Sequence, residues 1–275
     1  MIMLMLHFKE HPFRNLTFIF LFITTLIFFQ LNRLTIAFLI LFVLLLLVAF
    51  LQEKQRIFIW ITFAYFIGEL LYLYGNRFID SLSYHVNILL MLDKVLLLFP
   101  ILMIFYVCHK FKQDVSLFFK KTKWNQGISL SFLSRRLFYL SIYRFLMIAL
   151  SITTIMYLPF IILEAPNFQL RWFFWILVYA AISSIMEEVL WRGMIMTAMK
   201  NLTNESFAIF FSSAAYGFSY IMFGYSLSIC LLISLFGCYW GFVTFRSGSV
   251  IPAMIWHFVF QVLMVLSGVF TFLPI

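Results

Sequence analysis

Long apolar segments alternate with short polar ones along almost the whole chain. A helix needs about 20 predominantly apolar residues to cross a hydrocarbon core about 30 Å thick. The segments that approach this length begin near Leu16, Thr35, Ile57, Val86, Leu137, Trp172, Phe207, Leu227 and Val250. The pattern predicts an all-α fold, a polytopic transmembrane helical bundle of about eight or nine spans.

The number of spans depends on the first two segments, which only residues 30–33 separate. A loop this short is compatible with two separate crossings. It is also compatible with a re-entrant hairpin that returns to the side from which it entered. Whether both segments cross the membrane is therefore left open.

Composition agrees with a membrane protein, since 65% of the 275 residues are apolar and 11% are charged. Soluble domains average about 45–50% apolar and about 25% charged residues. Most lysines and arginines behind the net charge of +9 fall in one set of alternating loops. Because such residues mark the cytoplasmic side, we expect the N-terminus inside, a location in the plasma membrane and no nucleic-acid partner.

The longest polar stretch, residues 109–136, interleaves aromatic residues with lysines. This pattern suits a helix that lies in the anionic inner interface of the lipid bilayer, and an ordinary connecting loop would look the same. We predict two parts: residues 1–136, with N-terminal spans and this basic cytoplasmic loop, and residues 137–275, a transmembrane core.

The sixth apolar segment carries Glu187, Glu188 and Arg192, although a charge at mid-membrane costs about 2.5 to 3.5 kcal/mol on insertion scales. Glu188 and Arg192 are four residues apart and can pair on one helix face, whereas Glu187 is turned about 100° away. The spacing predicts a structural pair, Glu188 with Arg192, and a candidate reactive carboxylate, Glu187. Both glutamates could equally be neutralised by Arg192 and serve only to hold helices together.

Two later segments also carry polar side chains four residues apart, Tyr216 with Tyr220 and His257 with Gln261. Glu187 and Tyr220 lie at similar depths, roughly 20 Å at 1.5 Å per residue from the polar turn that joins their helices. These positions predict a polar pocket that is built from three helices and open to the cytoplasm.

The first and third of these motifs resemble the CPBP family of CAAX proteases and bacteriocin-processing membrane proteins, whose pattern is EExxxR, then FxxxH, then HxxxN or HxxxD. The first motif is present as Glu187, Glu188 and Arg192, and the third as His257 with Gln261 in place of asparagine.

The second motif departs from the family pattern, because Tyr216 replaces the phenylalanine and Tyr220 replaces the histidine. The resemblance covers roughly residues 172–270. It includes Gly237 and Gly241, whose spacing of four residues predicts a close helix-packing face.

The resemblance implies an intramembrane endopeptidase that cleaves membrane-associated peptides or proteins. Glu187 would be the base that activates water, and His257 and Gln261 would stabilise the oxyanion. Tyr220 is a poor substitute for the histidine, since losing a proton-transfer partner costs about 10²- to 10⁴-fold in rate. We therefore expect weak or lost activity, with a non-catalytic scaffold, regulator or bacteriocin self-immunity protein as the alternative.

A metal is left open by the resemblance. In an older view of the family the histidines bind a metal ion, so zinc is a possible cofactor. Zinc catalysis generally rests on three protein ligands, and only one of the motif histidines, His257, is present. No cofactor is predicted with certainty.

Four other charged residues fall within predicted spans: Glu69, Asp93, Lys94 and Arg144. We expect them to neutralise one another, because unpaired charges in a bilayer are disfavoured. They could also line the solute pathway of a transporter, although the sequence shows no inverted repeat of the kind common in transporters.

Overall fold

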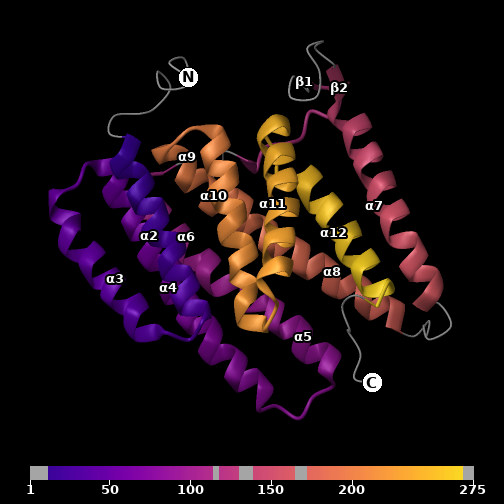
Figure 1. Cartoon of the computed structure of the whole chain (residues 1–275), viewed down its shortest axis with the longest axis horizontal. Coiled ribbons are helices and arrows are strands. Elements are labelled where there is room, and N and C mark those ends of the chain that lie inside the picture. Colours follow the sequence, from indigo (N-terminus) through magenta and orange to yellow (C-terminus); the bar gives the residue numbers. More distant parts are fainter. Residues whose placement is uncertain (1–11, 114–117, 130–138, 165–171, 269–275) are drawn as a thin grey trace. The chain divides into compact units, whose positions relative to one another are not determined.

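The computed structural model describes residues 12–113, 118–129, 139–164 and 172–268, and helices dominate these ranges (Figure 1). The α-helices are α2 (Pro12–Gln30), α3 (Leu34–Leu47), α4 (Glu53–Asp80), α5 (Val86–Val95), α6 (Leu98–Lys110), α7 (Ile142–Glu164), α8 (Phe173–Glu188), α9 (Met196–Leu202), α10 (Glu205–Phe218), α11 (Leu227–Ser247) and α12 (Ile251–Leu266). Shorter elements are the 3₁₀ helices η1 (Val48–Phe50) and η6 (Ser219–Phe223), the π-helix η5 (Val189–Ile195), and the antiparallel strands β1 (Gly127–Ser129) and β2 (Tyr139–Ser141).

Seven of the described helical segments are long and apolar enough to cross a membrane. They are residues Phe13–Gln30, Glu53–Asp80, Ile88–Lys110, Ile142–Glu164, Phe173–Leu202, Glu205–Phe223 and Leu227–Ser247. The other two predicted segments correspond to shorter apolar helices, Leu34–Phe50 and Ile251–Leu266. The predicted helical membrane bundle is confirmed, and the chain is an integral membrane protein.

The chain divides into two compact units, each assembled from three stretches of sequence. Unit 1 comprises residues 1–68, 100–117 and 190–242. Unit 2 comprises residues 69–99, 118–189 and 243–275. The predicted division at residue 136 stays a prediction.

In unit 1, neighbouring helices pack closely against each other at glycine residues. A Cβ atom on Gly68 of α4 would lie 2.2 Å from the Cα atom of Pro100 in α6, so only glycine fits there. Along α11, a Cβ on Gly237 would lie 3.1 Å from Ser213 Cβ, and one on Gly241 would lie 3.2 Å from Ile209 Cγ2. Both of these contacts are with α10, which confirms the close-packing face predicted from the glycine spacing.

Unit 2 is built around α8, which packs against α5 and against α12, while α12 also packs against α7. Met91, Ile176, Tyr179 and Val265 form a buried apolar cluster that joins α5, α8 and α12. This packing holds the polar residues of α8 and α12 in fixed register.

The basic loop is not helical over residues 119–129, which corrects the interfacial helix suggested by its composition. The Val250 N–H group donates to the Phe118 carbonyl at 2.8 Å, and Thr122 Oγ1 donates to Ser249 Oγ at 2.9 Å. These bonds hold the segment extended beside the start of α12. The rest of the predicted loop, residues 114–117 and 130–136, lies outside the described residues.

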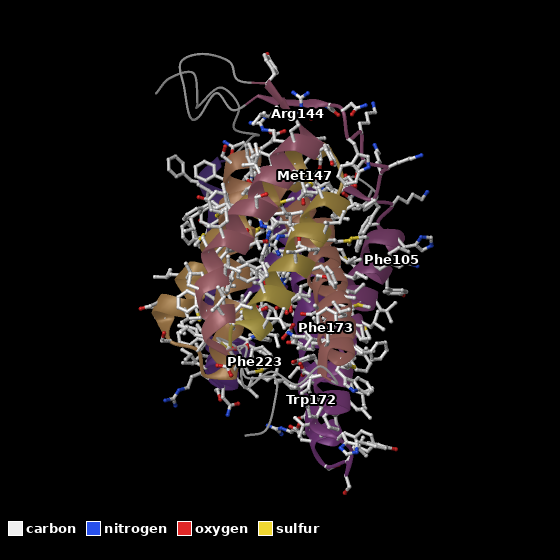
Figure 2. All side chains as sticks on the ribbon, turned by 90° about the vertical axis from the view of Figure 1, so that its right-hand side faces the viewer. Phe105, Arg144, Met147, Trp172, Phe173 and Phe223 are labelled. Carbon is white, nitrogen blue, oxygen red and sulfur yellow. The ribbon has the colours of Figure 1, made fainter. Side chains whose placement is uncertain are left out.

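Exposed apolar side chains cover much of the helix surface, as expected where lipid is the solvent. Phe105, Met147, Phe173 and Phe223 are among them (Figure 2). Arg144 lies in the first turn of α7 and is exposed. Figure 2 shows Arg144 and Trp172 at opposite ends of unit 2. Arg144 therefore lies within the candidate span Ile142–Glu164, as predicted, but its side chain is exposed rather than buried among other charges.

Candidate functional site

Four of the predicted site residues come together in unit 2, on two helices that pack against each other. Glu187 and Glu188 are the last two residues of α8, and His257 and Gln261 are one turn apart on α12. At most 3% of the surface of any of them is exposed. Buried polar groups are tolerated only when hydrogen-bonded, so their partners define the site.

The start of α12 is fixed by its sequence. Pro252 stands near the N-terminus of the helix, where its missing N–H group costs nothing. Gly248 precedes it with φ of +63°, a left-handed conformation that glycine adopts without strain. Ser247 Oγ donates to the Ser249 carbonyl at 2.8 Å and closes this turn. The turn sets where along the helix His257 and Gln261 lie.

His257 pairs with the second glutamate. Its Nδ1 atom lies 2.9 Å from Glu188 Oε1. Since an ionised carboxylate can only accept a hydrogen bond, Nδ1 carries a proton. The Nε2 atom lies 3.1 Å from Gln261 Nε2, whose amide donates to it when the imidazole is neutral. Glu188 thus fixes the orientation of the imidazole and leaves Nε2 facing Gln261.

Glu187 has different partners on its two oxygens. Oε1 accepts a hydrogen bond from the Lys94 ammonium at 2.9 Å and another from the Ser183 hydroxyl at 2.9 Å. Oε2 lies 3.8 Å from His257 Nε2, which is too long for a hydrogen bond. The carboxylate is therefore held through Oε1, while Oε2 faces the imidazole.

Ser183 connects Glu187 to Gln261. The Gln261 amide nitrogen donates to Ser183 Oγ at 2.9 Å, and the Ser183 hydroxyl donates onward to Glu187. Gln261 Oε1 is buried and has no hydrogen-bond partner among the described residues. The cluster therefore retains one buried acceptor that is free for a further donor.

Arg192, Tyr216 and Tyr220 belong to unit 1. The Arg192 guanidinium carbon lies 4.5 Å from the centre of the Tyr216 ring, and Nη2 donates to the Gly237 carbonyl at 3.3 Å. The Tyr216 and Tyr220 hydroxyls are 3.2 Å apart. The predicted pairing of Glu188 with Arg192, and the part of Tyr220 in the site, stay predictions.

Arg192 lies in a π-helix rather than in the regular α-helix that the sequence predicts. The segment η5, Val189–Ile195, follows directly on the two glutamates. π-Helical turns are rare and occur frequently at functional sites.

Sequence reasoning missed two members of the site, Ser183 and Lys94. Ser183 lies one turn before Glu187 on α8, so the four-residue spacing of polar residues could have revealed it. Lys94 comes from α5, 93 residues away in sequence. Its ammonium donates to Glu187, a partner that the sequence did not predict, and neighbouring Asp93 accepts a hydrogen bond from Tyr72 at 2.6 Å.

The donor set does not fit a zinc ion. Glu187 Oε1 already accepts from an ammonium group, and Nδ1 of the single imidazole is turned to Glu188. No group of three or more His, Cys, Asp or Glu side chains within the described ranges could hold a metal ion.

Residues 169–263 match the family model of the type II CAAX prenyl endopeptidase Rce1-like proteins, which form part of the CPBP family. The matched segment contains all of α8 and most of α12, and with them Ser183, the two glutamates, His257 and Gln261. Lys94 lies outside it. No curated protein and no solved structure matches the chain.

Proposed function

We propose that this chain, whose residues 169–263 match the family model of the Rce1-like endopeptidases, hydrolyses an amide bond of membrane-associated peptides or proteins. The observation that carries the proposal is the buried cluster of Glu187, Ser183, Gln261, His257 and Glu188. It supplies an ionisable base and hydrogen-bond donors within a few ångströms of each other. General acid-base catalysis and oxyanion stabilisation require these groups.

In the proposed reaction, Glu187 Oε2 takes a proton from a water molecule whose oxygen attacks the carbonyl carbon of the substrate. The Gln261 N–H group that pointed to His257 Nε2 leaves it and donates to the oxyanion that forms, while the other N–H stays on Ser183. In its imidazolium form, His257 also donates to this oxyanion, from Nε2. When the C–N bond breaks, the proton on Glu187 passes to the departing amine, which leaves a carboxylic acid, an amine and the ionised base.

The departure at Tyr220 makes slow turnover the expectation. The family's histidine at this position partners the glutamate in activating water, and a phenol does not accept that proton at neutral pH. The missing partner corresponds to a loss of about 10²- to 10⁴-fold in rate. Single-turnover measurements over hours are therefore the appropriate assay.

The test compares protein N-termini in host membranes that contain wild type or Glu187→Gln at matched abundance. Glu205→Gln is the control, because Glu205 is an exposed glutamate in the first turn of α10. The proposal expects specific N-termini to disappear in Glu187→Gln, to persist in Glu205→Gln and to return in a Glu187 revertant. An unchanged set of N-termini in Glu187→Gln would contradict it.

The departure at Tyr220 also favours a second candidate, a non-catalytic scaffold, regulator or bacteriocin self-immunity protein that binds its partner through the same cluster. In that case Glu187→Gln leaves the N-termini unchanged but alters which membrane proteins are cross-linked to the chain. We do not propose a transporter. Arg144 is exposed, and Lys94 donates to the proposed base Glu187, so neither residue supports a separate solute pathway.

We propose that the site faces the cytoplasm of a cell whose plasma membrane holds the chain. Lys120, Lys121 and Lys123 are exposed on the segment bonded to the start of α12, and Phe119 beside them is 44% exposed. Lysines with an exposed aromatic side chain suit the anionic inner interface. His257 follows Ile251 by six residues, roughly 9 Å along the helix from that end.

A further inference from the structure

Lys94 is a buried cation within an apolar segment. It lies near the end of α5 and is 8% exposed. Placing an ammonium group away from water is costly unless it is paired and hydrogen-bonded. Its bond of 2.9 Å to Glu187 Oε1 provides such a partner, at the carboxylate proposed as the base.

The contact is supported by the packing of the helices that carry the two residues. α5 packs against α8, and Met91, one turn before Lys94, belongs to the apolar cluster shared with Ile176 and Tyr179. Asp93, the nearest carboxylate in sequence, accepts a hydrogen bond from Tyr72. The apolar cluster that contains Met91 therefore holds this part of α5 against α8 without help from the ion pair.

Lys94 and Ser183 approach the same oxygen of Glu187. With two donors on Oε1, the carboxylate cannot rotate without breaking both hydrogen bonds. Oε2 is then the oxygen turned toward His257, on the side of the oxyanion donors.

We propose that Lys94 is a positioning residue of the site, which fixes Glu187 through Oε1 so that Oε2 is the oxygen that takes the proton from water. The proposal rests on the proposed endopeptidase function. It assigns a role to a residue outside the segment that matches the family model. Lys94 thus gives the base a cationic partner from α5.

The experiment uses the full chain in detergent with Lys94→Met, Lys94→Arg, Glu187→Gln and the double variant Lys94→Met/Glu187→Gln. Methionine replaces lysine by an unbranched, uncharged side chain that is one atom shorter, and arginine keeps the charge. Lys54→Met is the control, because Lys54 is exposed in the first turn of α4. The readouts are the Tm of each variant and, for those that retain Glu187, the kcat and KM for a cleaved peptide.

Lys94→Met should lower Tm by on the order of 10 °C, because it leaves a carboxylate buried without its cation. The double variant should recover at least half of this loss, since the remaining amide is neutral. We expect kcat to fall about 100-fold in Lys94→Met, as a misplaced base implies, with KM within about twofold of wild type. Lys94→Arg should restore kcat to within about tenfold of wild type, and Lys54→Met should change neither readout.

Additive losses of Tm in the double variant would show that the two residues do not act as a pair, and would overturn the assignment. An unchanged kcat in Lys94→Met would show that Lys94 does not position Glu187, and would overturn the positioning role. If the wild type cleaves nothing while the Tm values show recovery, the endopeptidase proposal and the positioning role both fail. The ion pair would then stand as a purely structural contact.

Discussion

At the scale of single residues, the site depends on side chains that hydrogen-bond to two neighbours at once. Gln261 replaces the asparagine of the family pattern, and its longer side chain reaches both Ser183 Oγ at 2.9 Å and His257 Nε2 at 3.1 Å. Ser183 in turn donates to Glu187. One hydroxyl therefore joins the proposed base to the proposed oxyanion donor.

Two adjacent serines provide a matched test of this link. Ser183 and Ser184 are both buried, but the Ser184 hydroxyl donates only to the Ala181 carbonyl of its own helix, at 3.2 Å. Ser183→Ala leaves buried polar groups short of a partner and should lower the free energy of unfolding by about 1–3 kcal/mol. It should also slow cleavage, whereas Ser184→Ala should change either quantity little. Denaturation in detergent and single-turnover assays measure both, and equal effects of the two substitutions would refute the link.

Residue identities explain why the sequence predicted part of the site and missed the rest. The motif residues Glu187, Glu188, His257 and Gln261 follow short spacings on single helices, which sequence patterns report directly. The partner of Lys94 is 93 residues away. Nothing in the local sequence distinguishes Glu187 from Asp93, Glu69 or any other carboxylate of a neighbouring helix, so this pairing required the packing of α5 on α8.

At the scale of helices, the length and position of each segment follow from hydropathy, because every backbone polar group within a bilayer must be satisfied inside its own helix. Which helices touch is instead set by small residues. On α4, Gly68 faces the backbone of Pro100, while Gly75 faces the flexible end of the Leu96 side chain, whose Cδ atoms would lie 3.0 and 3.1 Å from an added Cβ.

These two glycines of one helix should respond in opposite ways to alanine. Gly68→Ala places a Cβ against main-chain atoms that cannot move aside, and should cost about 1–3 kcal/mol or more from overpacking. In Gly75→Ala, Leu96 can rotate, and the helix propensity of alanine offsets the contact by up to about 1 kcal/mol. Tm measurements on the purified variants check this. A Tm that falls as far in Gly75→Ala as in Gly68→Ala would contradict the prediction.

At the scale of the whole molecule, the number of helical segments was predictable but their grouping was not. Each unit gathers three separate stretches of sequence, and α4, α6 and α11 contribute residues to both. The helix geometry predicted from sequence also fails at η5, because a π-helix depends on tertiary packing that no periodicity records. Orientation in the bilayer remains a prediction from charge.

Cysteine labelling decides the orientation. Lys121 in the basic segment 118–123 and Ser81 in the turn that follows α4 are both exposed residues of unit 2, and the charge pattern places the first inside and the second outside. In a background whose three cysteines are replaced by alanine, a membrane-impermeant thiol reagent should label Ser81→Cys on intact cells. It should label Lys121→Cys only in inverted vesicles. The cysteine-free protein should be labelled neither on intact cells nor in inverted vesicles. Labelling of Lys121→Cys on intact cells would place the start of α12, and the proposed site about 9 Å along it, on the outer side, so that substrates would have to be sought outside the cell.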